Sequence, residues 1–240
     1  MEQETKQKIL RHLIHFPSSS YSQLWDKKIP SNKFTYYLNQ LTDKGYIEKK
    51  NSKYSLTTKG KHLEASLDGN TGETRKRPFV AVVVVVKKDN KYLMCERLKE
   101  PYYGSFGFIG GKVEFGEDIL KCAQRELFEE TNLKGKGKIF IIDNIKTYEN
   151  NKELAHYVHY GILFENTKGK LLPESMEGKF SFVKKREFIK HYKEKQLYPA
   201  ALKLLNTIPY FKKTNRIKGY DVKIYIENQK YVKTIFKKMF

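Results

Sequence analysis

Acidic side chains gather in one stretch of the chain, Gly111 to Leu133, which reads GKVEFGEDILKCAQRELFEETNL. Residues 117–131 contain neither Gly nor Pro and are rich in helix formers, which predicts a single helix. Leu120, Ala123 and Leu127 recur at helical spacing, so we expect them to form its buried stripe.

Three glutamates crowd a neighbouring face of this helix. Glu126, Glu129 and Glu130 lie at positions i, i+3 and i+4, so their like charges repel and weaken the helix. A hard divalent cation, Mg²⁺ or Mn²⁺, would remove the conflict, because such ions bind carboxylate and phosphate oxygens together. Gly110 and Gly111, just upstream, allow the backbone to approach a ligand closely. The pattern therefore predicts metal-assisted chemistry on a phosphate.

The spacing resembles the Nudix hydrolase signature: Gly, five residues, Glu, seven residues, Arg-Glu, an aliphatic residue, any residue, Glu-Glu, any residue, Gly and an aliphatic residue. The chain matches Gly111 and every charged position. It departs at Asn132, where the family usually has Gly, and at Ile109, where the run before the signature is often Pro-Gly-Gly. Asn tolerates positive φ, so we expect the helix exit to survive. A solvated acidic surface helix is the alternative, which so many matches at fixed spacing disfavour.

The resemblance implies roles for particular residues. It makes Glu126, Glu129 and Glu130 metal ligands, with the carbonyl of Gly110 as a further one. Arg125 would orient a carboxylate or the substrate's phosphates through its planar fork. The general base is expected on a loop after the signature, where Glu174 and Glu177 are the candidates and Glu177 is preferred. The expected catalytic residues are therefore Glu130, Glu129, Arg125 and Glu177, and the expected phosphate-binding residues are Gly111, Lys112, Glu117 and Arg125.

Composition sets the broad class of the protein. The 240 residues suffice for two domains, and the net charge of +20 fits either a solvated lysine-rich surface or attraction to phosphorylated partners. Two cysteines are too few for a metal knuckle and fit a reducing compartment. The N-terminus opens with polar and charged residues rather than a signal peptide, and the apolar run 79–86 is too short to span a bilayer. We therefore expect a cytoplasmic protein without membrane contact.

The first 67 residues predict helices at 3–16, 21–28 and 31–44, a hairpin at 46–56 and a helix at 58–67. Ser31 is expected to be the N-cap of the third helix, and Gly45 to end it. This order resembles the winged helix-turn-helix domain. The local charge, twelve Lys and Arg against six Asp and Glu, favours a nucleic-acid partner such as DNA.

The winged-helix resemblance implies a DNA-binding surface. The third helix would enter the major groove, and the hairpin wing would meet phosphates. The expected contact residues are Asn32, Lys33, Thr35, Tyr36 and Gln40 on the helix, and Lys49, Lys50 and Lys53 on the wing. The alternative is a winged helix used for protein contacts or dimerisation.

The rest of the chain divides into three predicted parts. Residues 68–78 have two glycines and almost no apolar side chains, which is typical of a linker. Residues 79–208 predict strands at 79–87, 91–98, 138–147, 154–165 and 180–183, followed by helices at 185–195 and 199–207. The Nudix resemblance implies that they form an α/β/α sandwich with a mixed sheet. Residues 209–240 predict a basic β-hairpin that completes a nucleic-acid surface or packs on the N-terminal domain, or alternatively joins two copies in a homodimer.

The predicted fold class is therefore α+β, with a winged helix-turn-helix domain (1–67), a Nudix domain (79–208) and a basic C-terminal extension. The leading functional hypothesis is a Mg²⁺- or Mn²⁺-dependent hydrolase that cleaves a diphosphate bond in a nucleoside diphosphate derivative. One alternative is a transcription regulator whose Nudix domain senses a nucleotide-type ligand without cleaving it, and another is direct action on RNA ends. The sequence leaves the particular substrate open.

Overall fold

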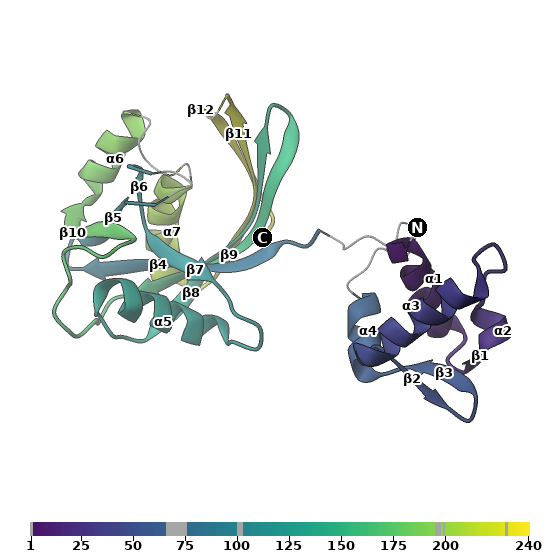
Figure 1. Ribbon diagram of the computed structural model, residues 1–240. Helices are drawn as coiled ribbons and strands as arrows, with labels where there is room; N and C mark the ends of the chain where they lie inside the picture. Colours follow the sequence, from purple (N-terminus) through teal and green to yellow (C-terminus); the bar gives the residue numbers. More distant parts are fainter. Residues whose placement is uncertain (1, 66–75, 100–102, 195–197, 199, 229) are drawn as a thin grey trace. The chain divides into compact units, whose positions relative to one another are not determined.

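The computed structural model describes residues 2–65, 76–99, 103–194, 198, 200–228 and 230–240. The chain divides into two compact units, Met1–Lys76 and Arg77–Phe240, and each is described by itself (Figure 1). Most of the predicted linker, residues 68–78, lies outside the described residues. Among the described helices, none is both long and apolar enough to span a membrane.

The N-terminal unit is a winged helix. Its elements are α1 (Glu2–His15), β1 (Ser19–Ser20), α2 (Tyr21–Leu24), α3 (Ser31–Asp43), β2 (Ile47–Lys50), β3 (Lys53–Leu56) and α4 (Thr58–Ala65). The strands pair antiparallel in the order β1-β3-β2. Asn51 and Ser52 both have positive φ, which suits the tight turn between the two wing strands. The core lies where α1 and α3 meet β2 and β3, and Ile9, Leu13 and Phe34 are almost completely buried in it.

Two local features of this unit differ from the prediction. The second helix ends at Leu24 rather than residue 28, because Trp25 is extended and its indole N–H donates to the carbonyl of Ile29 at 2.8 Å. Pro30, not Ser31, is the N-cap of α3, and the Ser31 hydroxyl instead lies 3.1 Å from the Tyr21 hydroxyl. Gly45 has φ +69° just past α3, as the predicted stop requires.

The second unit carries a nine-stranded mixed sheet. Its elements are β4 (Phe79–Lys88), β5 (Lys91–Arg97), β6 (Phe106–Gly107), β7 (Ile109–Lys112), α5 (Ile119–Thr131), β8 (Gly137–Glu149), β9 (Lys152–Phe164), β10 (Gly178–Lys184), α6 (Lys185–Lys193), α7 (Ala201–Thr214), β11 (Lys218–Glu227) and β12 (Lys230–Lys238). The strand order is β10-β5-β4-β9-β8-β11-β12, and β6 pairs with β5 while β7 pairs with β4. The β4–β9 and β8–β11 pairs are parallel.

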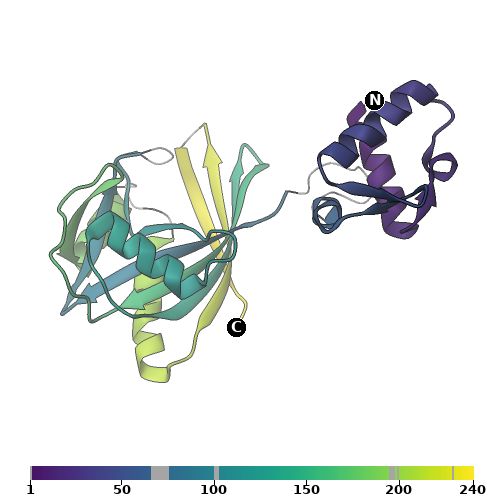
Figure 2. The same cartoon turned by 60° about the horizontal axis from the view of Figure 1, so that its bottom comes forward.

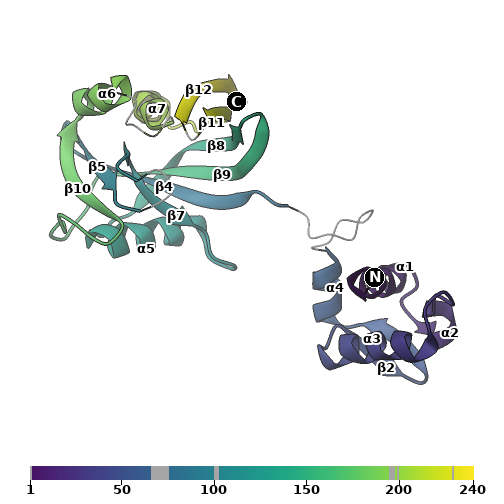
Figure 3. The ribbon, with the colours of Figure 1, turned by 45° about the horizontal axis from the view of Figure 1, so that its top comes forward.

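Helices cover both faces of this sheet. Figure 3 shows α5 on one side of β4 and β9, with α6 and α7 on the other. The valine run in β4 fits this arrangement, because Val82 and Val84 face the core under α5 while Val83 and Val85 face the core under α7. A strand buried on both faces is expected to be apolar at every position. The predicted α/β/α sandwich is therefore confirmed.

The C-terminal residues belong to the same sheet. Strand β11 lies between β8 and β12, so the yellow strands in Figure 2 continue the sheet rather than form a separate module. Helix α7 also runs through Pro209 to Thr214, so the domain boundary that we predicted at residues 208 and 209 falls inside a helix. Burial of Phe211, two residues after the proline, helps to offset the hydrogen bond that Pro209 cannot make.

Strand β11 offers a test of this placement. Ile224 is 1% exposed in the core under α7, whereas Ile235, on the neighbouring strand, is 46% exposed. We expect Ile224→Ala to lower the free energy of unfolding by about 2–4 kcal/mol, because it leaves a cavity. The matched control Ile235→Ala should change it by less than about 0.5 kcal/mol. Urea unfolding followed by far-UV circular dichroism measures both values, and equal effects would contradict a core role for β11.

Candidate active site

Two successive glycines allow β7 to pack closely against β4 and helix α5. In β7, Gly110 pairs with Val83 and Gly111 with Val82 of β4. A Cβ atom on Gly110 would lie 2.2 Å from the carbonyl oxygen of Val82, and one on Gly111 would lie 2.0 Å from Oε1 of Glu126. Both positions therefore require glycine, the first for the strand and the second for a helix carboxylate.

The buried face of helix α5 differs from the predicted stripe. The structure buries Cys122, Ala123 and Leu127, but Leu120 is 41% exposed, so its predicted place in the stripe is wrong. The helix begins at Ile119 and its inward face turns toward Cys122 and Glu130, because Glu130 lies under β7 with only 7% exposure. Asn132 ends the helix with φ +58°, which confirms that asparagine replaces the usual glycine there.

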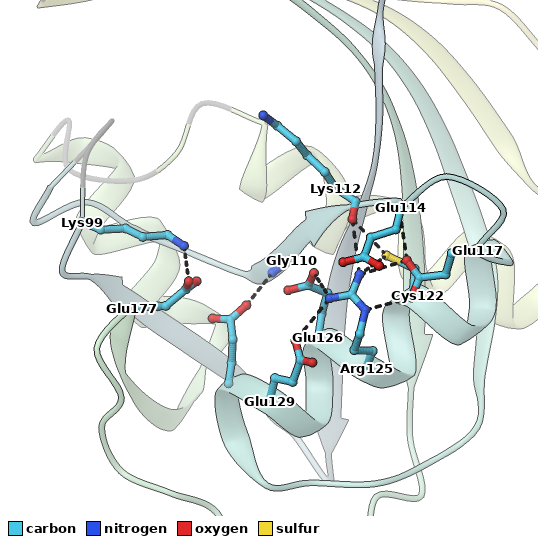
Figure 4. Close-up of polar contacts among 11 residues, drawn as sticks. Lys99, Gly110, Lys112, Glu114, Glu117, Cys122, Arg125, Glu126, Glu129 and Glu177 are labelled. Atoms are coloured by element: carbon cyan, nitrogen blue, oxygen red, sulfur yellow. Dashed lines mark hydrogen bonds and ion pairs between the residues drawn. The ribbon is translucent and has the colours of Figure 1, made fainter. Parts of the chain in front are cut away.

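A single guanidinium links three of the four signature glutamates (Figure 4). Nε and Nη2 of Arg125 donate to the two carboxylate oxygens of Glu117 at 2.8 and 2.9 Å. Nη1 donates to Glu126 at 2.7 Å and to Glu129 at 3.2 Å. The fork thereby relieves the repulsion that the i, i+3 spacing creates.

This pairing changes the role expected of Glu117. The hydrogen bonds from Arg125 lower the pKa of Glu117 to about 2, and the same contacts raise the pKa of Arg125. The Glu114 backbone N–H adds a further hydrogen bond to Glu117 at 3.1 Å. Glu117 thus lies in a two-pronged ion pair that positions Arg125, rather than among free phosphate-binding groups.

Glu130 differs from its neighbours on the helix. Its Oε1 accepts a hydrogen bond from the Gly110 backbone N–H at 3.2 Å. Burial, with a smaller contribution from the nearby charges of Glu177 and Glu126, raises its pKa to about 7, against the lowering effect of the Gly110 N–H. Burial likewise raises the pKa of Glu126, although Arg125 opposes that shift. The site therefore holds two carboxylates whose negative charge is poorly solvated.

The loop before β10 brings a fifth glutamate to the site. Glu177 is close enough to raise the pKa of both Glu126 and Glu130, and its side chain pairs with Lys99. Figure 4 shows Glu177 directed toward the side of the site where Gly110 lies. The other candidate base, Glu174, is exposed and bridges to Lys179 through its backbone. Lys99 was not anticipated, since a lone lysine after a strand carries no sequence signal.

Lys112 contacts the site through its backbone carbonyl and not through its ammonium group. Its carbonyl lies 3.4 Å from Nη2 of Arg125, while its ammonium lies over the ring of Phe79, 4.3 Å from the centroid. In Figure 4 its side chain extends away from the carboxylates. A direct contact between this ammonium and phosphates at the carboxylates would need a different rotamer.

The donor set fits a hard cation by its chemistry. Glu126, Glu129 and Glu130 offer carboxylate oxygens, the ligands that Mg²⁺ and Mn²⁺ prefer. Within the described part of the chain, no three acidic, cysteine or histidine side chains already converge as a ligand set. The Arg125 guanidinium instead lies between Glu126 and Glu129. Burial disfavours the ionised form of Glu130. A bound cation would stabilise that ionised carboxylate.

The residues predicted to bind nucleic acid lie on the surface of the N-terminal unit. Asn32, Lys33 and Tyr36 are exposed on α3, and Gln40 is half-buried. Thr35 is also exposed, but its hydroxyl lies 3.1 Å from that of Tyr21. On the wing, Lys49, Lys50 and Lys53 are all exposed, and Lys50 pairs with Glu48 at 2.8 Å.

Comparisons with known proteins agree with this geometry. Residues 76–207, more than half of the chain, match the family model of the NUDIX domain, and residues 27–72 match that of a winged helix-turn-helix. The chain is 44% identical over 61 residues to an ADP-ribose pyrophosphatase of Methanocaldococcus jannaschii, covering 25% of this chain and 36% of that protein. It is 35% identical over 79 residues to an RNA pyrophosphohydrolase of Pelagibacter ubique, covering 33% of this chain and 49% of that protein.

The chain thus spans less than half the length of these curated relatives. A solved structure of a MutT protein from Bacillus halodurans shares the fold, with a TM-score of 0.52 and 20% identity over 66% of this chain and 97% of that one. The domain match and the shared fold cover the strands, glycines and helix that build the site. The chain therefore belongs to the Nudix family, with a winged helix-turn-helix region ahead of its Nudix domain.

Proposed function

We propose that this chain is a hydrolase that cleaves a diphosphate bond in a nucleoside diphosphate derivative, with Mg²⁺ or Mn²⁺ as cofactor. One observation carries the proposal: Glu126, Glu129, Glu130 and Glu177 lie around the Gly110–Gly111 strand with too few cations to balance them. The named activities of the two curated relatives, both pyrophosphate hydrolases, support the same reaction class.

The proposed reaction assigns a separate role to each group of residues at the site. Bound metal would neutralise the diphosphate and acidify a water molecule. Glu126, Glu129 and Glu130 would hold it, with the Gly110 carbonyl as a further ligand. Arg125, fixed by Glu117, would orient Glu126 and Glu129 or a substrate phosphate. Glu177 would accept the proton of the attacking water, and its ion pair with Lys99 would position it.

A substrate panel tests the proposal directly. ADP-ribose, dinucleoside polyphosphates and a 5′-triphosphorylated RNA oligonucleotide would each be incubated with the full chain and Mg²⁺. Release of nucleotide or phosphate from any of them supports hydrolysis and identifies the substrate class. No turnover of any compound, with binding retained, would favour a ligand sensor instead.

Glu130→Gln separates catalysis from folding. We expect kcat to fall by about two to four orders of magnitude, because the amide cannot supply a ligating negative charge. Stability should change little, since burial already disfavours the ionised carboxylate. Steady-state kinetics at saturating Mg²⁺, together with a thermal melt, measure both effects.

Asp118→Asn is the matched control for Glu130→Gln. Asp118 precedes the same helix, its side chain is 72% exposed, and it pairs with Lys121. Near-normal turnover is expected for this variant. Comparable turnover in Glu130→Gln would refute the assignment of Glu130.

A second candidate function is a regulator that binds DNA and responds to a nucleotide. The match of residues 27–72 to a winged helix-turn-helix, and the exposed lysines of its wing, favour it. Hydrolysis and DNA binding are compatible in one chain. The two functions would use separate surfaces, α3 with the wing and the site at α5.

Wing lysines provide the test of DNA binding. We expect Lys49→Gln with Lys53→Gln to weaken duplex DNA binding and to flatten the slope of log K against log salt by about 2, because two phosphate contacts are lost. The control pair Lys8→Gln with Lys61→Gln removes the same charge from exposed positions on α1 and α4. Both pairs are measured by fluorescence anisotropy over a salt series. Equal effects would mean that DNA binding depends on the net charge and not on contacts made by the wing.

A further inference from the structure

An alternating run of lysine and glycine follows α5. Residues 134–138 read Lys-Gly-Lys-Gly-Lys, and the three lysines are exposed while the two glycines are half-buried. The segment leads into β8, and alternate residues of an extended chain point to the same side. Lys134, Lys136 and Lys138 all line one cleft, as side chains about 7 Å apart on one side of an extended backbone would, and the ammonium of Lys134 lies 4.5 Å from the centroid of the Phe128 ring. We call them the lysine row.

The glycines explain why the row faces outward. A Cβ on Gly137 would lie 2.3 Å from Cγ2 of Ile162 and 2.8 Å from the ring of Phe164. A Cβ on Gly135 would lie 3.3 Å from the same ring. The backbone thus lies directly on β9, and only side chains on its other side have room.

The lysine row lines a cleft of about 750 Å³. Lys168 stands beside it, because the backbones of Lys134 and Lys168 exchange hydrogen bonds of 2.8 and 2.7 Å. Lys212, from α7, completes the set and pairs with Glu165 at 2.6 Å. Glu165 is the one acidic residue among the described lining residues, so the cleft carries a net charge of +4. A second hollow of about 470 Å³ shares Lys168 and Glu165 with the cleft and adds Lys87, Lys88 and Asp89.

We propose that this cleft binds the phosphate backbone of single-stranded nucleic acid. Five lysines facing one carboxylate give a strongly positive channel, and the regular row suits a chain of evenly spaced phosphates better than a single anion. The one aromatic side chain among the described lining residues, Phe211, is 7% exposed and unavailable for stacking on bases. Recognition is therefore of the backbone and independent of sequence.

The cleft is distinct from the two sites already discussed. Its lining residues include none of the acidic residues of the candidate active site, and all of them lie in the second unit rather than in the winged helix. Its function therefore does not depend on hydrolysis or on binding of duplex DNA by the wing. Each can be lost while the others remain.

The test uses the full chain and a fluorescent oligonucleotide of about 12 nucleotides, within the range that such sites cover. We expect the triple change Lys134→Gln, Lys136→Gln and Lys138→Gln to weaken binding about tenfold or more at low salt, and to flatten the salt slope by about 2. The triple change to Arg should retain binding, since it keeps the charges. Turnover of a small nucleotide substrate should stay unchanged in both.

The matched control removes three exposed lysines elsewhere in the same unit, by Lys152→Gln, Lys223→Gln and Lys237→Gln. It lowers the net charge equally and should change affinity less than about threefold. Equal weakening in control and row variants would overturn the proposal in favour of unspecific attraction. Unchanged binding in the row variant would overturn it outright. The proposal would also be overturned if the row variant lost as much affinity for a duplex of the same length as for the single strand, because the proposal requires a single strand.

Discussion

The contact of Arg125 with Glu117, Glu126 and Glu129 is the interaction on which the candidate site depends. Three glutamates within five residues of one helix would repel one another and open away from β7. The guanidinium gathers two of them and is itself fixed by the paired oxygens of Glu117, at 2.8 and 2.9 Å. Because only a planar fork can make these contacts at once, lysine would not replace arginine here.

Close packing of backbone sets the other limit on the site. Gly110 lies against the carbonyl of Val82, and Gly111 against the carboxylate of Glu126, with no room for a Cβ in either place. Glu130 is consequently buried beneath the strand, where its charge is poorly solvated. Strand and helix thus hold the glutamates close together, and Glu130 is the one whose ionised form is destabilised by burial.

Fixed spacing and local chemistry made much of this predictable. The Nudix signature indicated the helix and its acids, and Asn132 tolerates the positive φ that ends the helix. Periodicity alone misjudged Leu120, because the buried face of α5 is set by contacts with β7 that a helical pattern does not contain. Pro209 suggested a boundary, yet packing of Phe211 carries α7 past it. The pairing of Lys99 with Glu177 joins distant segments, for which local sequence holds no signal.

The position of β11 has a consequence for synthesis of the chain. This strand pairs in parallel with β8, whose partner residues come 77 positions earlier (Lys218 with Ile141), and it carries part of the core under α7. On the ribosome, β8 must therefore wait with an open edge until the residues through Glu227 have left the exit tunnel. The winged-helix unit ends at Lys76, so all of its residues have been synthesised long before β11. The nascent Nudix unit thus exposes an unpaired strand edge and part of its apolar core, the features that favour aggregation during folding.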